Sequence, residues 1–207
     1  MIIDMGYYGT GTDPRKKVSL KLPEVFPEFS LKRIKLRKVC PEDVGSVYTG
    51  LSDPRVVAQY GVSYTSLAAT DEQMRWFEQI ISQETGRWWA IALNADDSMI
   101  GACGLNDWCH KHRKAEIGYW LMPEHWRKGL LTEALPAVIR YGFRDMGLHR
   151  IHADVEPENK PSCALLTKFG FHLEGTLRDV ELKDGKFLSL HQYSLLSSDA
   201  VASQLLD

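Results

Sequence analysis

Apolar and polar residues alternate with the two-residue period of β-strands in several stretches of this chain. The runs 88–93, 99–105 and 115–122 are separated by short polar segments, which predicts an antiparallel meander. Asp184 and Gly185 separate the last two runs, and this dipeptide is typical of a β-hairpin turn. The predicted strands are 31–39, 88–93, 99–105, 115–122, 151–155, 171–182 and 187–195.

Four other stretches show the 3.6-residue period of amphipathic helices. Thr70 with Gln73 three residues later has the pattern of a capping box at a helix start. Gly147 and Gly170 follow the last apolar positions of two helices, where glycine commonly ends a helix. The four predicted starts lie near Pro41, Thr70, Lys128 and Asn159.

The resulting order, β-α-α-β-β-β-α-β-α-β-β, predicts a fold of the α/β class. We expect a mixed, mostly antiparallel sheet with helices on both faces. Residues 1–30 are rich in glycine and proline without a sustained period, so they are interpreted as an N-terminal extension. Residues 31–198 then form one domain, and residues 199–207 form a C-terminal tail.

Composition narrows the classes of function. The chain has 207 residues, 44% hydrophobic and 25% charged, as in an ordinary globular protein. Its net charge of −2 lacks the basic excess of a nucleic-acid binder, so no nucleic acid is expected as a partner. It has neither a membrane-length apolar run nor the order of a signal peptide, so a cytoplasmic location is expected. The four cysteines are irregularly spaced, and we expect neither a disulfide framework nor a metal site.

A short basic loop before the third helix carries the first candidate chemistry. Arg127 and Lys128 precede Gly129, which opens the helix. Free N–H groups at a helix start, together with the helix dipole, bind anions. Two cations beside such a start suit a pyrophosphate, although a solvated basic turn has the same composition.

Two blocks around this loop resemble a known family. The segment Trp126-Arg127-Lys128-Gly129-Leu130-Leu131-Thr132-Glu133-Ala134 resembles motif A of the GNAT superfamily of acetyltransferases. The segment from Asn159 to Ser162, followed by Lys168-Phe169-Gly170-Phe171 and Glu174-Gly175, resembles the RimJ/RimL-type branch of that superfamily. The resemblance covers roughly residues 31–196 and implies a GNAT fold.

The resemblance also implies that acetyl-CoA is the co-substrate and that a primary amine accepts the acetyl group. A backbone N–H near Leu121 or Met122 is the candidate donor to the reacting carbonyl oxygen. Two positions depart from the family: Leu131 is bulkier than usual, and Leu166 replaces a tyrosine that often serves as general acid. The residues expected to bind acetyl-CoA are Leu121, Met122, Arg127, Lys128, Gly129, Leu130, Leu131, Thr132, Asn159 and Ser162.

Three residues are candidates for catalysis. Glu116 lies on a predicted strand where similar enzymes often place a carboxylate near the amine, and Glu181 matches an acidic position of RimL-type enzymes. Either one is a candidate base, and each has the alternative of a structural or exposed carboxylate. Ser162, in the first turn of the fourth helix, is the candidate donor to the departing thiolate.

Three hypotheses about the function remain open, and the first two differ in the amine that accepts the acetyl group. A protein or peptide N-terminal α-amine comes first, because roughly 10–17% of such an amine is neutral at pH 7, against under about 0.1% of a lysine-type amine. A small-molecule amine is the second hypothesis, and an acidic pocket would favour a polycation. A non-catalytic acyl-CoA-binding module is the third. The protein is expected to be a monomer or a homodimer. The loop 60–70 is expected to set specificity. Five tryptophans are expected either to line a substrate pocket or, for most of them, to pack in the core: Trp76, Trp88, Trp89, Trp108 and Trp120.

Overall fold

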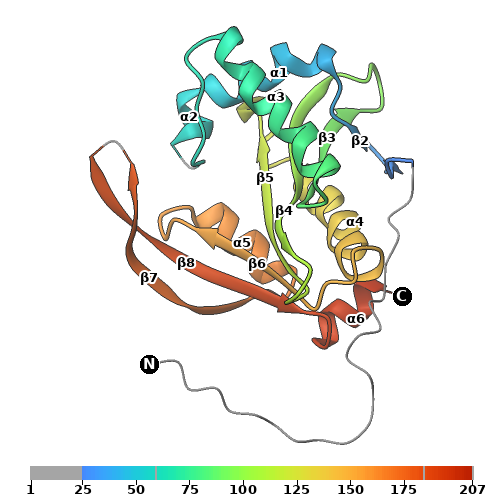
Figure 1. Ribbon diagram of the computed structural model, residues 1–207, viewed down its shortest axis with the longest axis vertical. Helices are drawn as coiled ribbons and strands as arrows, with labels where there is room; N and C mark the ends of the chain where they lie inside the picture. Colours follow the sequence, from blue (N-terminus) through green and yellow to red (C-terminus); the bar gives the residue numbers. More distant parts are fainter. Residues whose placement is uncertain (1–24, 59, 184, 207) are drawn as a thin grey trace, which may run out of the picture.

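The strands pair into one eight-stranded sheet in the computed structural model, which describes residues 25–58, 60–183 and 185–206. The order across the sheet is β1-β2-β3-β4-β5-β6-β8-β7 (Figure 1). The strands are β1 Phe29–Ser30, β2 Ile34–Lys38, β3 Arg87–Leu93, β4 Met99–Cys109, β5 Lys114–Leu121, β6 Arg150–Val155, β7 His172–Lys183 and β8 Lys186–Leu196.

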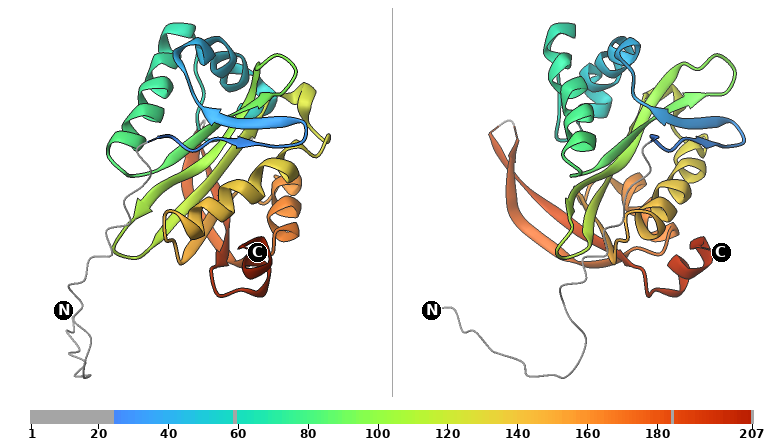
Figure 2. Two further views of the ribbon diagram at one scale, coloured as in Figure 1. Left: turned by 90° about the vertical axis from the view of Figure 1, so that its right-hand side faces the viewer. Right: turned by 45° about the vertical axis from the view of Figure 1, so that its right-hand side comes forward.

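Antiparallel pairing joins every pair of neighbouring strands except β5 and β6, which run parallel. This confirms the predicted mixed, mostly antiparallel sheet. The β7–β8 hairpin curves away from the remainder of the sheet, as the right-hand view of Figure 2 shows. Nearly every residue of β7 is exposed, because β7 is an edge strand without a covering layer.

Helices cover both faces of the sheet, as predicted. On one face α1 and α3 bury Val47, Leu51 and Phe77 against the side chains of β3 and β4. On the other face α4 and α5 enclose the larger core, and α6 packs against α4. The helices are α1 Val44–Ser52, α2 Pro54–Val57, α3 Leu67–Ser82, α4 Leu130–Arg144, α5 Lys160–Lys168 and α6 Ala200–Leu206, with 3-10 turns at Pro41–Asp43 and Pro123–His125. Among the described residues, no helix is long and apolar enough to cross a membrane.

The start of α3 differs from the prediction. Ser66, with extended backbone, is the N-cap, and its side-chain oxygen accepts a hydrogen bond from the N–H of Ala69. Thr70 lies one turn inside the helix, fully buried, and its hydroxyl donates to the Ser66 carbonyl. The capping-box prediction was therefore wrong, because an N-cap must lie at the extended residue before the first turn.

Both ends of the domain contain structure beyond the predicted strands and helices. Phe29 of β1 falls in the expected extension, and its ring lies 5.8 Å from that of Trp89 in the core. The expected tail contains α6, which buries Ala202 completely. Residues 1–24 of the expected extension lie outside the described residues.

Candidate active site

A gap opens between the two parallel strands β5 and β6. Lys114–Glu116 pair with Arg150–His152, but residues 117–121 have no partner on β6, although both strands lie wholly within the described residues. The two strands therefore diverge beyond Glu116. Backbone N–H groups on the facing edge of β5 are therefore not bonded to β6, whereas the Leu121 carbonyl there accepts from Trp126 Nε1 at 2.7 Å.

The direction of the N–H groups on β5 separates the two predicted oxyanion donors. The N–H of Met122 donates to the Ile100 carbonyl at 2.9 Å, so it is already used within the sheet. Because hydrogen-bonded positions alternate in an antiparallel ladder, the N–H of Leu121 points away from β4, toward the gap. The prediction for Met122 as a donor is therefore corrected, and Leu121 is the donor that faces the gap.

A cavity of about 550 Å³ lies at the start of α4, between the basic loop, the gap and α5. We call it the α4 cavity. Of the ten residues predicted to bind acetyl-CoA, Met122 and Lys128 do not line this cavity. The eight that line it are Leu121, Arg127, Gly129, Leu130, Leu131, Thr132, Asn159 and Ser162.

The basic loop is held in place by Arg33. Its guanidinium donates to the carbonyl of Lys128 at 2.8 Å and to the Glu133 carboxylate at 2.8 Å. Gly129 has φ of 74°, a left-handed conformation that favours glycine, and α4 begins directly after it. The first helical N–H groups thus point into a cavity that Arg127 also lines, which suits an anionic group such as a pyrophosphate.

The two departures from the family pattern have different outcomes. Leu131 packs partly against the core and also lines the α4 cavity. Leu166 is fully buried in the core, so it supplies no group to the site. Instead the hydroxyl of Tyr119, on β5, lies 2.8 Å from the Ser162 hydroxyl oxygen across the gap. Tyr119 was not among the predicted site residues. That prediction considered the strand positions that share a face with Glu116 and Gly118, and Tyr119 belongs to the alternate set.

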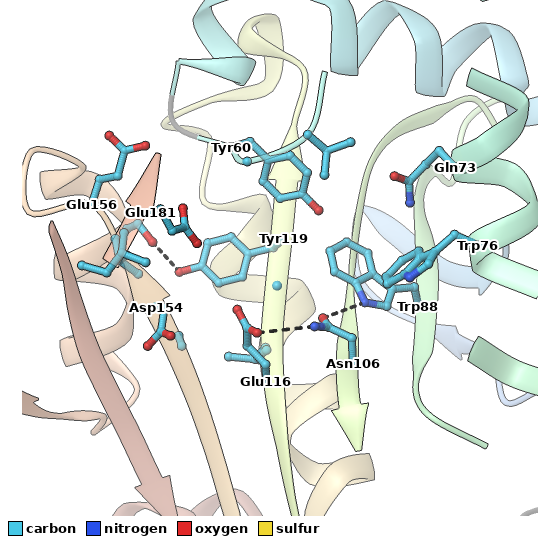
Figure 3. A pocket seen from close by; sticks show the side chains of 18 of the residues that line it. Tyr60, Gln73, Trp76, Trp88, Asn106, Glu116, Tyr119, Asp154, Glu156 and Glu181 are labelled. Atoms are coloured by element: carbon cyan, nitrogen blue, oxygen red, sulfur yellow. Dashed lines mark hydrogen bonds between the residues drawn. The ribbon is translucent and has the colours of Figure 1, made fainter. Parts of the chain in front are cut away.

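A second, larger cavity of about 790 Å³ lies between the sheet, α3 and the β7–β8 hairpin. We call it the carboxylate cavity, because five carboxylates line it against one guanidinium, that of Arg75. Figure 3 shows the acids of β6 and β7 on one side and Trp76, Trp88 and Gln73 on the other, with Glu116 between them. The five carboxylates belong to Glu72, Glu116, Asp154, Glu156 and Glu181.

The carboxylate of Glu116 lies largely buried in this cavity. Burial, reinforced by the negative charges of Asp154 and Asp107, raises its pKa from 4.5 to about 7. Its oxygen accepts a long hydrogen bond of 3.5 Å from Asn106, whose own oxygen accepts one from Trp88 at 3.3 Å (Figure 3). Glu116 thus exchanges a proton near neutral pH, which suits a general base.

The two cavities meet at a common wall. Four residues line both of them: Tyr60, Tyr119, Asn159 and Ser162. The side chain of Asn159 caps α5 as predicted, because its oxygen accepts a hydrogen bond from the N–H of Ser162 at 3.2 Å. A ligand in one cavity can therefore react with a ligand in the other only beside these four residues.

The β7–β8 hairpin is tied across the cavity by Lys183. Its ammonium donates to the carbonyls of Val57, the last residue of α2, and Ala58, its C-cap, at 2.9 and 3.1 Å, and to Glu156 at 3.3 Å. Glu181, the second predicted base, is exposed on the same strand and lines the carboxylate cavity. The two predicted bases therefore lie in one cavity, but only Glu116 is substantially buried.

The remaining expectations divide between the cavities and the core. Trp88, Trp89, Trp108 and Trp120 are all buried core residues. Trp88 also lines the carboxylate cavity, together with the partly buried Trp76, and Trp120 also lines the α4 cavity. The loop expected to set specificity contributes to the carboxylate cavity through Tyr60, Gly61, Val62 and Tyr64. Within the part of the chain that the structure describes, no group of three or more His, Cys, Asp or Glu residues could hold a metal ion.

Comparison with known proteins identifies the family. A family model described as acetyltransferase (GNAT) domain matches residues 33–172. The chain is 33% identical over 173 residues to the uncharacterized N-acetyltransferase YoaA of Bacillus subtilis (strain 168), covering 83% of this chain and 98% of that protein. It is 36% identical over 104 residues to the putative ribosomal N-acetyltransferase YdaF of the same organism, covering 50% of this chain and 57% of that protein.

Solved structures agree on the fold. The spermidine N-acetyltransferase from Vibrio cholerae in complex with CoA and spermine superposes with a TM-score of 0.72 at 23% identity, covering 84% of this chain and 99% of that chain. The eight-stranded sheet is thus the predicted GNAT fold. The chain belongs to the family of GNAT acetyltransferases, and it is an acetyl-CoA-dependent N-acetyltransferase.

Proposed function

We propose that the enzyme transfers the acetyl group of acetyl-CoA to a primary amine of a small polycation, such as a polyamine. The observation that carries this proposal is the negative charge of the carboxylate cavity, where five carboxylates face one guanidinium and one of the five, Glu156, is already paired with Lys183. An excess of one sign of charge in a low-dielectric cavity concentrates a ligand of the opposite sign. A substrate with two or three ammonium groups gains most from such a lining.

The α4 cavity is the proposed site of acetyl-CoA. Its pyrophosphate would meet the first N–H groups of α4 and the side chain of Arg127, and its apolar arm would follow the gap beside β5. The N–H of Leu121 is the proposed donor to the thioester oxygen, and Ser162 the proposed donor to the sulfur. The thioester would then lie where the two cavities meet.

Glu116 is the proposed base for the reacting amine, and Glu181 the proposed partner of a remote ammonium group. An acidic cavity also stabilises the reacting amine as ammonium, so that amine needs a base beside it. Glu116, with a pKa of about 7, is ionised in about half of the molecules at neutral pH and accepts the proton directly or through water. Glu181 is more exposed, which suits binding better than proton transfer.

A protein or peptide N-terminal α-amine is the second candidate acceptor. The sequence analysis placed it first because a larger fraction of an α-amine is neutral at pH 7. The similarity to a putative ribosomal N-acetyltransferase supports it. An α-amine brings a single positive charge, however, so it offsets less of the negative charge of the cavity than a polycation does. The charge of the cavity therefore reverses the order of the two candidates. We also propose that the enzyme is located in the cytoplasm and that it is a monomer or a homodimer.

The test is release of CoA thiol with acceptors that differ in charge. A triamine, a diamine and a monoamine of matched chain length are compared with peptides that have free N-termini. We expect kcat/KM to rise about tenfold per added charge, equivalent to about 1.4 kcal/mol, and to fall with added salt.

Glu181→Gln supplies the matched variant. It should raise KM for the triamine several-fold while leaving the monoamine almost unchanged. Glu78→Gln removes an exposed carboxylate of α3 that does not line the cavity, and it should change neither value. Turnover of peptides but not of polyamines would refute the polycation, and binding of acetyl-CoA without any turnover would favour an acyl-CoA-binding module.

A further inference from the structure

Two hydroxyl groups, one on β5 and one in the first turn of α5, face each other at the gap between β5 and β6. The phenol oxygen of Tyr119 lies 2.8 Å from the side-chain oxygen of Ser162, at a distance typical of a strong O–H···O hydrogen bond. Both residues line both cavities. The pair therefore lies where an amine in the carboxylate cavity must meet a thioester in the α4 cavity.

The first turn of α5 holds Ser162 rigidly. Its backbone N–H is bound by the capping oxygen of Asn159 at 3.2 Å, and Pro161 precedes it in the first helical turn. The hydroxyl of Ser162 can still rotate, because a serine side chain has one proton and no fixed direction for it. A second group must therefore fix that direction.

Tyr119 has the properties of that second group. Burial raises its pKa to about 12, so the phenol keeps its proton throughout the neutral range. A phenol is also a better hydrogen-bond donor than an aliphatic hydroxyl and a weaker acceptor, because its oxygen lone pair is delocalised into the ring. The favoured direction of the bond is thus from Tyr119 to Ser162, which leaves the Ser162 proton pointing elsewhere.

We propose that Tyr119 is a positioning residue, which donates its phenol proton to the Ser162 hydroxyl and so directs the Ser162 proton to the sulfur of acetyl-CoA. This rests on the proposed function of the site. The amine nitrogen forms a bond to the thioester carbon, the carbon–sulfur bond breaks, and its electron pair remains on sulfur. Ser162 stabilises that thiolate by a hydrogen bond. Glu116 takes the first proton of the ammonium. The neutral amine then loses one further proton on becoming the amide and the thiol gains one, so neither hydroxyl group is consumed.

The arrangement also accounts for the tyrosine missing from α5. Leu166 is fully buried and has no polar atom to offer. The phenol comes from β5 instead, and it acts through Ser162 rather than on the sulfur itself. In this proposal the Ser162 hydroxyl lies nearest the sulfur, and Tyr119 behind it fixes the direction of the Ser162 proton.

A double-mutant cycle tests the proposal, with kcat and KM for acetyl-CoA measured for Tyr119→Phe, Ser162→Ala and the double variant. Tyr119→Phe should lower kcat about fivefold to tenfold, with little change in KM, because one hydrogen bond is lost. Ser162→Ala should lower kcat at least as much, and the double variant should be no slower than Ser162→Ala. Ser162→Thr keeps a hydroxyl, so Tyr119→Phe should remain harmful in that background.

Tyr141→Phe is the matched control. It removes a buried phenol hydroxyl that lines neither cavity, and kcat should not change. Multiplying effects in the double variant, or an effect of Tyr119→Phe on KM alone, would overturn the proposed role while wild-type turnover continues. Absence of thiol release by the wild type with every amine would instead overturn the proposed function, and this role with it.

Discussion

Replacing Glu116 with glutamine should make the protein more stable and less active at once. Folding raises the pKa of this carboxyl from 4.5 to about 7, chiefly because the group leaves water. The difference between these two pKa values corresponds to about 3 kcal/mol. Solvent still reaches part of the side chain, so we expect about 2–3 kcal/mol in practice.

The sign of the effect follows from the direction of the change. The folded protein holds this proton more tightly than the unfolded chain, so ionisation of Glu116 disfavours the native state. The cost is absent below the unfolded pKa of 4.5, grows as the pH rises, and is nearly complete above about pH 7. Glutamine is never ionised, and Glu116→Gln therefore avoids the cost.

Thermal and denaturant unfolding of the wild type and of Glu116→Gln, at about pH 5 and about pH 8, would measure the stability cost of ionising Glu116. At about pH 8 the variant should unfold about 5–10 °C above the wild type, and at about pH 5 the gain should be small. Its kcat should fall at least about a hundredfold, as expected for loss of a general base. Glu78→Gln, on the exposed side of α3, should change neither property. Equal stability of wild type and Glu116→Gln at both pH values would refute the reasoning.

Three further predictions concern the frame of the site. Arg33→Ala should raise KM for acetyl-CoA about tenfold with little change in kcat in steady-state kinetics, because the Lys128 carbonyl and the basic loop lose their support. Gly129→Ala should destabilise the protein by about 1–2 kcal/mol in denaturant unfolding and weaken acetyl-CoA binding in calorimetry, because the left-handed backbone there disfavours a side chain. Lys183→Met should speed hydrogen exchange in the β7–β8 hairpin, because the hydrogen bonds to the carbonyls of Val57 and Ala58 are lost. Unchanged exchange would contradict that role.

Much of the fold could be predicted from the sequence because local periodicity reports burial. The strands of the meander and the helix after Gly129 were found in this way, and the cap at Asn159 was correct in detail. The missed helix α2 also carried a signal, since Asp53 followed by Pro54 is a typical N-cap and first position. The error at Thr70 arose because Ser66 offered an equally good cap four residues earlier.

The site could be predicted only in part, because its two halves are encoded differently. The basic loop and the cap of α5 are short contiguous motifs, and the structure brings them to one cavity. The five carboxylates of the other cavity come from α3, β5, β6, β7 and the turn after β6. No local pattern links such distant positions. The pairing of Tyr119 with Ser162 likewise depends on the divergence of β5 from β6, which only the tertiary structure reveals.

The most direct test of the account follows a labelled acetyl group from acetyl-CoA to a triamine by mass spectrometry. Each acetyl group lost from acetyl-CoA should appear on the amine as one acetamide, with one equivalent of free CoA thiol, and Glu116→Gln should nearly abolish this transfer. Free thiol without acetylated amine, or label found only on peptide α-amines, would contradict the proposed transfer to a polyamine.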